Sequence, residues 1–287
     1  MRRLNVVPLG DRRRWLAPWP SPTARSQQWT ARYALTALVA SWLVSGVVVL
    51  ALRLVGVRIP IGLGVLIRDA IFLATLAPLY RSGSLRTVDL GLRRVPGARS
   101  VGLVLLGLLA YGWFSVLWTS AVHPPPVRSP FLGIAHQSTI VIVLTGFAAA
   151  VSAPVVEEIF FRGLLYRSFR NRLGIGPACV IAGALFGLGH TDYPLLVRPE
   201  LAFFGVVAAL LYERTGSLLP GIAMHSFIDA TGFEIGLTGN DRVVITVFLL
   251  FTIILLAHPP LRGLGRLLTG KPVFRPGGRP MSDSQGG

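Results

Sequence analysis

The chain alternates long apolar segments with short polar ones. Eight segments are apolar enough to predict helices, at residues 33–54, 61–80, 100–122, 138–161, 176–190, 200–213, 218–236 and 243–258. Because a helix needs about 20 mainly apolar residues to cross the lipid core, the pattern predicts an all-α, polytopic membrane helix bundle with about eight transmembrane helices. The fifth and sixth segments are short and contain glycine, which is tolerated where protein rather than lipid surrounds a helix.

Charged residues are few, and most of them lie in the polar segments between the apolar ones. Only 14% of the residues are charged, whereas soluble domains carry about 25%, and of 28 basic residues only Lys271 is not an arginine. The arginines gather in every second polar segment, at residues 1–32, 81–99, 167–172, 214 and 262–275. By the positive-inside rule these segments lie in the cytoplasm. We therefore expect a multi-pass cell-membrane protein with both termini cytoplasmic, and the arginine and alanine content favours a bacterial plasma membrane.

A net charge of +16 can also indicate nucleic-acid binding. Here the arginines form short blocks between apolar segments, which is typical of membrane topology. We therefore expect the lipid bilayer as a partner and no nucleic acid. Nothing in the sequence indicates an oligomeric state.

Composition divides the chain into four regions. Residues 1–30 and 261–287 are rich in Pro, Gly, Ser and Arg and predict disordered cytoplasmic tails, the first of them basic. Between the tails, Pro124, Pro125 and Pro126 separate a leading three-helix membrane region, residues 31–130, from a second membrane region, residues 131–260. The candidate chemistry lies in the second region.

Three short motifs place ionisable side chains inside apolar segments. An ionisable group at membrane depth costs at least a few kcal/mol, so such groups persist mostly where they pair or take part in chemistry. The motifs therefore predict a polar site buried in the bundle. They are Glu157-Glu158-Ile-Phe-Phe-Arg162, Phe186-Gly-Leu-Gly-His190 and His225-Ser-Phe-Ile-Asp229.

The first motif assigns different environments to its two acids. Glu158 and Arg162 are four residues apart, a helical spacing that allows a direct ion pair. Glu157 is rotated by about 100° from its neighbour, so we expect it to be free to face a cavity. All three could form a structural ion cluster at a helix end, but one carboxylate is enough to pair the arginine, and the second acid favours a functional site.

The histidines complete a hydrolytic set. A buried carboxylate and an imidazole can share a water and remove its proton, while a second histidine with a polar neighbour, here Asp229, can stabilise an oxyanion. Equally, Glu157, His190 and His225 could bind a catalytic zinc with an open fourth position. Both alternatives hydrolyse an amide with an activated water, and the sequence leaves them open, so no cofactor is required and zinc is possible.

The remaining polar residues are expected to be structural. Arg68 and Asp69 in the second apolar segment predict an intrahelical or interhelical polar pair. Glu213 with Arg214 predicts solvated charges at a helix end. Cys179 lies in an apolar segment and is expected to pack as a small hydrophobe. His123, His136 and His258 are interpreted as incidental.

In these motifs the chain resembles the CPBP family, the CAAX-processing and bacteriocin-processing membrane proteases whose domain is also called Abi. The family pattern is Glu-Glu-x-x-x-Arg, then Phe-x-x-x-His, then His-x-x-x-Asn or a similar residue in place of Asn. The resemblance covers roughly residues 138–232, within the second membrane region. Further similar stretches are Arg162-Gly-Leu-Leu-Tyr166, Thr215-Gly-Ser-Leu-Leu-Pro-Gly-Ile-Ala-Met-His225 and Asp89-Leu-Gly-Leu-Arg-Arg94.

The resemblance implies an all-helical bundle and an intramembrane endopeptidase. Its substrate would be a membrane-associated peptide or protein, CAAX-like or other. It also implies that Glu157 and His190 activate the water, and that His225 and position 229 stabilise the oxyanion. Asp229 departs from the family, where this residue is usually an amide. An ionised aspartate would repel an oxyanion, so we expect Asp229 to orient His225 and hold its tautomer.

Two hypotheses from other functional classes are alternatives to a protease. Some members of the family act in immunity or as scaffolds, so a non-catalytic membrane module is one alternative. A proton-coupled transporter is the other, but the internal repeat that many transporters carry is not seen in the sequence.

Overall fold

In the computed structural model, the described residues are 30–126 and 131–240, with gaps at 83–84, 86–89, 93–96 and 132, together with the single residues 242 and 246. The chain divides into two compact units, Met1–Asp241 and Arg242–Gly287, and the helices described below belong to the first. The predicted helix at 243–258, apart from residue 246, and the predicted tails, apart from Thr30, lie outside the described residues.

The described residues form helices and no strand, as the apolar pattern predicts. The first three helices agree with the predicted segments to within three residues at each end. The elements are α1 (Ala31–Leu54), α2 (Ile61–Arg81), α3 (Gly97–Val122), the 3₁₀ turn η3 (Ile134–His136), α4 (Thr139–Phe147), η4 (Ala148–Ser152), α5 (Ala153–Glu157), η5 (Glu158–Tyr166), α6 (Arg167–Leu173), α7 (Ile175–Gly189), α8 (Arg198–Thr215) and α9 (Leu219–Thr238).

Within the described part of the chain, four helical stretches are long and apolar enough to cross a membrane. They are Ala31–Leu54, Ile61–Arg81, Ser100–Val122 and Thr139–Leu173, and α7 is a shorter apolar helix. Large apolar side chains on α1, such as Leu43 at 64% and Val47 at 65% exposed, face outward, which suits lipid better than water. The protein is a polytopic helical membrane bundle.

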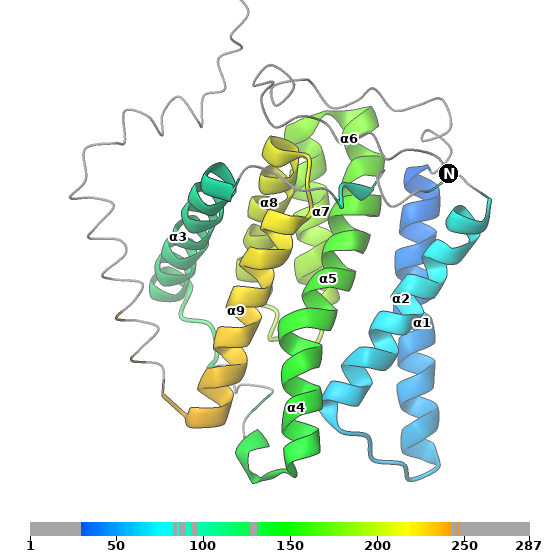
Figure 1. Ribbon diagram of the computed structural model, residues 1–287, viewed down its shortest axis with the longest axis vertical. Helices are drawn as coiled ribbons and strands as arrows, with labels where there is room; N and C mark the ends of the chain where they lie inside the picture. Colours follow the sequence, from blue (N-terminus) through cyan, green and yellow to red (C-terminus); the bar gives the residue numbers. More distant parts are fainter. Residues whose placement is uncertain are drawn as a thin grey trace, which may run out of the picture. The chain divides into compact units, whose positions relative to one another are not determined.

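The helices surround the stretch from α4 to α6 (Figure 1). On one side α2 packs against α4, η4 and α5, and α1 packs against α2. On the other side α9 packs against η4 and α5, α8 packs against η5, and α3 lies against α8 and α9. The stretch from α4 to α6 therefore contacts both the leading helices and the later ones.

This central stretch is one continuous helix with two π-helical segments, η4 and η5. We predicted that it ends at residue 161, but it continues to Leu173 and ends before Gly174, whose φ of 80° breaks the helix. Two of the basic residues after 161, Arg162 and Arg170, have partners within the bundle. Arg170 pairs with Glu213 of α8 at 2.8 Å, so Glu213 is not the solvated charge we predicted. Wide π turns within α-helices occur frequently at functional sites.

Helices α7 and α8 pack closely together, and glycine makes the approach possible. A Cβ at Gly187 would lie 2.5 Å from the carbonyl oxygen of Arg198, and one at Gly183 would lie 2.6 Å from that of Ala202. Small residues at such contacts let membrane helices pack backbone to backbone. This packing sets where the C-terminal end of α7, and therefore His190, lies.

Candidate active site

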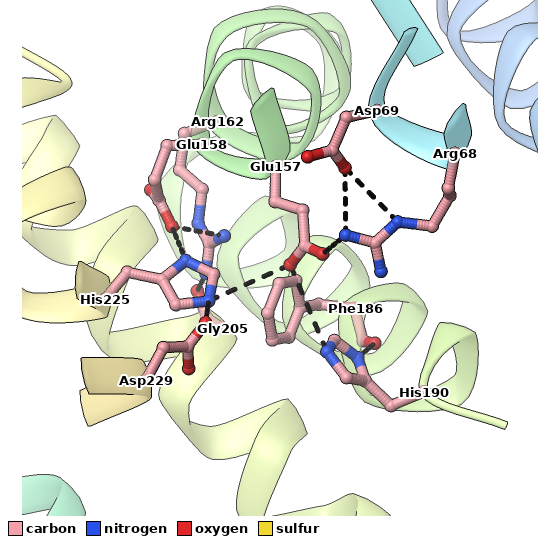
Figure 2. A network of polar contacts seen from close by, with 10 residues as sticks. All are labelled: Arg68, Asp69, Glu157, Glu158, Arg162, Phe186, His190, Gly205, His225 and Asp229. Carbon is pink, nitrogen blue, oxygen red and sulfur yellow. Dashed lines mark hydrogen bonds and ion pairs between the residues drawn. The ribbon is translucent and has the colours of Figure 1, made fainter. Parts of the chain in front are cut away.

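The three motifs meet in the bundle although they come from separate helices (Figure 2). The adjacent acids lie where the central helix changes from α to π geometry, since Glu157 ends α5 and Glu158 begins η5. The first histidine follows the last residue of α7, and the third motif lies on α9. The side chains that converge are Glu157, Glu158, Arg162, His190, His225 and Asp229.

Glu158 and Arg162 form the predicted ion pair. Their Oε1 and Nη1 atoms are 2.8 Å apart, and both side chains are only 1% exposed. Arg162 also donates from Nη2 to the carbonyl oxygen of Gly205 at 3.3 Å, and its guanidinium lies over the Phe186 ring at 4.7 Å. A buried pair needs such additional partners to offset the loss of water. This pair anchors the site.

Glu157 is also paired, contrary to the prediction that it is free. Its Oε1 lies 2.7 Å from Nη2 of Arg68 on α2. Arg68 and Asp69 were predicted to form an intrahelical or interhelical polar pair, and both contacts are present: Arg68 pairs with Asp69 at 3.0 Å, and the same guanidinium nitrogen reaches the central helix. Each of the two adjacent acids therefore has its own arginine.

The second oxygen of Glu157 faces both histidines. Oε2 lies 3.8 Å from Nε2 of His225 and 4.0 Å from Nε2 of His190. It is buried and has no hydrogen-bond partner within the described part of the chain. Two atoms at these separations can both hydrogen-bond to one water oxygen at about 2.8 Å from each. The predicted convergence of the carboxylate and the two imidazoles is thus present.

The two histidine rings are held differently. Nδ1 of His190 lies 2.7 Å from the carbonyl oxygen of Phe186, and because a carbonyl only accepts, that nitrogen carries the proton. In the neutral ring of His190, Nε2 is then free of a proton and can accept a hydrogen bond. Nδ1 of His225 lies 3.2 Å from Oε1 of Glu158, while its Nε2 faces Glu157 and Asp229. Carboxylates on both sides stabilise the imidazolium form of His225. His190 is therefore suited to accept a proton and His225 to donate one.

Asp229 contacts His225 through Nε2 at 3.5 Å, and its side chain is 32% exposed. The predicted contact of Asp229 with His225 is therefore present, and its role in orienting the ring stays a prediction. Glu158 shares the ring from the Nδ1 side, whereas Asp229 lies on the same side as Glu157 and adds a second carboxyl group there.

Sequence reasoning predicted a polar pair at Arg68 and Asp69 but not its contact with Glu157. Asp69 is 3% exposed and accepts a hydrogen bond from Ser152 at 2.7 Å. The available signal was an arginine and an aspartate inside an apolar segment, where each charge is costly. These charges show that a partner is needed. They do not identify Glu157 as that partner, because Arg68 and Glu157 are far apart in the sequence.

The zinc alternative gains no support from this geometry. Ligand bonds of about 2.0–2.2 Å place two ligand atoms of a tetrahedral zinc about 3.3–3.5 Å apart, and the distances from Glu157 to the imidazoles are 3.8 and 4.0 Å. The positive charge of Arg68 on the same carboxylate also disfavours a cation. Among the described residues, no three His, Cys, Asp or Glu side chains are grouped to hold a metal.

Fold and site together define a polytopic membrane protein whose bundle encloses a glutamate–histidine cluster. Residues 139–231 match the family model described as type II CAAX prenyl endopeptidase Rce1-like. This match covers all three motifs. The chain therefore belongs to the CPBP family.

Two relatives are similar over longer stretches. An uncharacterized 24.3 kDa protein of Escherichia coli is 30% identical over 168 residues, which are 56% of this chain and 70% of the relative. CAAX prenyl protease 2 of Homo sapiens is 30% identical over 101 residues, which are 29% of this chain and 31% of the human protein. The chain thus spans less than a third of the human relative. No solved structure gives a significant match.

Proposed function

We propose that this protein is an intramembrane endopeptidase that hydrolyses a peptide bond with a water activated by Glu157 and His190. One observation carries the proposal. Oε2 of Glu157 is buried without a hydrogen-bond partner among the described residues, and it faces the Nε2 atoms of two histidines at 3.8 and 4.0 Å. A water at this point would contact a carboxylate base and an accepting imidazole together.

The proposed reaction proceeds in two steps. Glu157 takes one proton from the water, and Nε2 of His190 accepts a hydrogen bond from its other O–H. The water oxygen attacks the scissile carbonyl carbon, and the developing oxyanion accepts a hydrogen bond from Nε2 of His225. The tetrahedral intermediate then collapses, the carbon–nitrogen bond breaks, and the proton held by Glu157 passes to the leaving amine. The products are a carboxylic acid and an amine, and Glu157 returns to its ionised form.

The substrate we propose is a membrane-associated peptide or protein. The human relative's name supports a CAAX-type prenylated peptide as the first substrate to test. Three side chains mark the side from which a substrate would approach, since Arg68, His190 and Asp229 are 34%, 22% and 32% exposed. The acids at the centre of the site are buried.

We further propose that the chain crosses the membrane eight times in a bacterial plasma membrane. The arginine alternation supports this topology with both termini in the cytoplasm. In this arrangement α7, α8 and α9 complete the spans together with residues 243–258. Helices as short as α7 can cross where neighbouring helices surround them.

Cleavage in proteoliposomes tests the proposal. The purified protein is incubated with a prenylated CAAX-type peptide and with a library of unlipidated membrane-spanning peptides. We expect cleavage of at least one, and its loss in Glu157→Ala. Metal analysis and chelator treatment of the active sample address the zinc alternative, since unchanged activity at sub-stoichiometric metal supports the glutamate type. Failure to cleave any peptide would favour a non-catalytic membrane module.

A further inference from the structure

We propose that Arg68 of α2 is a positioning residue for the proposed reaction, because it sets the rotation of the Glu157 carboxylate. This inference rests on the proposed function. Arg68 lies outside the segment matched by the family model, residues 139–231. The leading helices would then complete the site as well as anchor the protein.

The two oxygens of Glu157 have different surroundings. Nη2 of Arg68 holds Oε1 at 2.7 Å, which leaves Oε2 toward the imidazoles of His190 and His225. A carboxylate rotates easily about its last side-chain bond unless a partner holds one oxygen. Among the described residues, Arg68 is the residue with an ion pair to Oε1. It therefore decides which oxygen faces the reacting water.

Arg68 is itself held by its neighbour Asp69. Its Nε and Nη2 atoms contact Oδ1 of Asp69 at 3.3 and 3.0 Å. The other oxygen of Asp69 accepts a hydrogen bond from Ser152 at 2.7 Å. Ser152 ends η4, five residues before Glu157 on the same continuous helix. Ser152 of the central helix holds Asp69, Asp69 holds Arg68, and Arg68 in turn pairs with Glu157 of the same central helix. The guanidinium is therefore held between two carboxylates.

Ser152 and Glu157 reach the pair from one short α-helical step of the central helix. The residues Ala153–Glu157 are α-helical, and positions five apart in an α-helix are rotated by about 140° from each other. The two side chains therefore leave the helix in different directions, and α2 meets each of them with a different residue. Asp69 accepts from Ser152, and Arg68 pairs with Glu157.

Charge explains why the residue is an arginine. Asp69 and Glu157 are 3% and 6% exposed, and Arg68 lies between them. Its planar guanidinium can contact two carboxylates at once in fixed directions, whereas a lysine provides a point charge without this geometry. Substituting lysine would keep the charge and lose the orientation, which separates positioning from simple charge balance.

The test compares variants of the full chain in proteoliposomes. We expect Arg68→Met to lower kcat about 100-fold with KM nearly unchanged, because a small misplacement of a catalytic group costs this much. Arg68→Lys should recover part of the loss, and Asp69→Asn should lower kcat about tenfold. Arg81→Met, at the exposed end of the same helix, is the matched control and should retain wild-type kcat.

Two results would overturn the inference. One is a folded Arg68→Met protein with wild-type kcat beside an inactive Glu157→Ala protein. The other is equal kcat losses in Arg68→Lys and Arg68→Met. If Arg68→Met does not fold, the kcat values of Arg68→Lys and Asp69→Asn test the proposal in its place. Wild-type kcat in both variants would reject it.

A second readout separates this inference from the proposed function. Thermal unfolding midpoints of Arg68→Met, Glu157→Gln and the double variant report whether the two residues are coupled without any need for cleavage. Non-additive shifts support the contact, and additive shifts reject it. A protein that cleaves nothing but shows coupling would refute the proposed function and leave the Arg68–Glu157 contact supported.

Discussion

Nδ1 of His225 lies 3.2 Å from Oε1 of Glu158, the same oxygen that holds Arg162 at 2.8 Å. Glu158 therefore fixes the imidazole from the side opposite to Glu157. The two adjacent acids have different tasks as a result: Glu158 orients a histidine, and Glu157 presents an oxygen to the space between both histidines. This division leads to the first prediction.

Glu157→Gln should abolish cleavage, with a loss of at least about 100-fold in kcat, because an amide cannot accept the proton of the water. The shape of the side chain is retained, so the bundle should stay folded. Cleavage assays on purified protein measure the loss. Glu234→Gln, an exposed acid on α9, serves as control and should cleave at the wild-type rate. Activity retained in Glu157→Gln would contradict the assignment of the base.

Asp229→Asn should lose little activity, whereas Asp229→Ala should lose much more. Asn keeps a polar group beside Nε2 of His225, which lies 3.5 Å from Asp229, and it can donate to an oxyanion without adding negative charge. Alanine removes the group. Rates of both variants are compared in one assay. Equal inactivity of Asn and Ala would show that the negative charge is required, and two near-normal rates would show that residue 229 plays no part.

Arg162→Met should destabilise the bundle by about 3–5 kcal/mol, because it leaves the buried carboxylate of Glu158 without its charge partner. Both side chains are 1% exposed. Chemical denaturation in detergent measures the change. The double variant Arg162→Met with Glu158→Gln should be less destabilised than the single one, since no unpaired charge remains. A larger loss in the double variant would show that packing of the arginine, not its charge, holds the site.

Gly187→Ala should destabilise the protein by about 1–3 kcal/mol. A Cβ at this position would lie 2.5 Å from a backbone oxygen of α8, so α7 would have to move away. The matched control is Gly176→Ala on the same helix, where a Cβ meets nothing within 4 Å. Thermal unfolding in detergent compares the two. Because α7 carries His190 at its end, Gly187→Ala should also lower cleavage. Equal stability of both variants would contradict the close contact.

The eight-span topology makes a labelling prediction. In a Cys179→Ala background, Arg81→Cys should be protected from a membrane-impermeant thiol reagent in intact cells, and Val57→Cys should react. Val57 lies between α1 and α2 and is 45% exposed. The reagent can therefore reach a cysteine at this position if the segment lies outside the cell. Labelling of residue 81 from outside would overturn the predicted orientation.

The sequence by itself determined the features that depend on neighbours along the chain. Apolar length predicted the helices because a spanning helix must satisfy its own backbone in lipid. The ion pair of Glu158 with Arg162 followed from a spacing of four residues, which is local to one helix. The family was also readable, because the order and spacing of the three motifs survive without coordinates.

Only the tertiary structure decided which distant groups share the site. Arg68 contacts Glu157 because α2 packs against the central helix, and no periodicity within either segment contains that information. The continuation of the central helix to Leu173 likewise depends on partners from other helices, such as Glu213 for Arg170. A charge in an apolar segment shows that it needs a partner, but the partner's identity is set by helix packing, which is a property of the whole bundle.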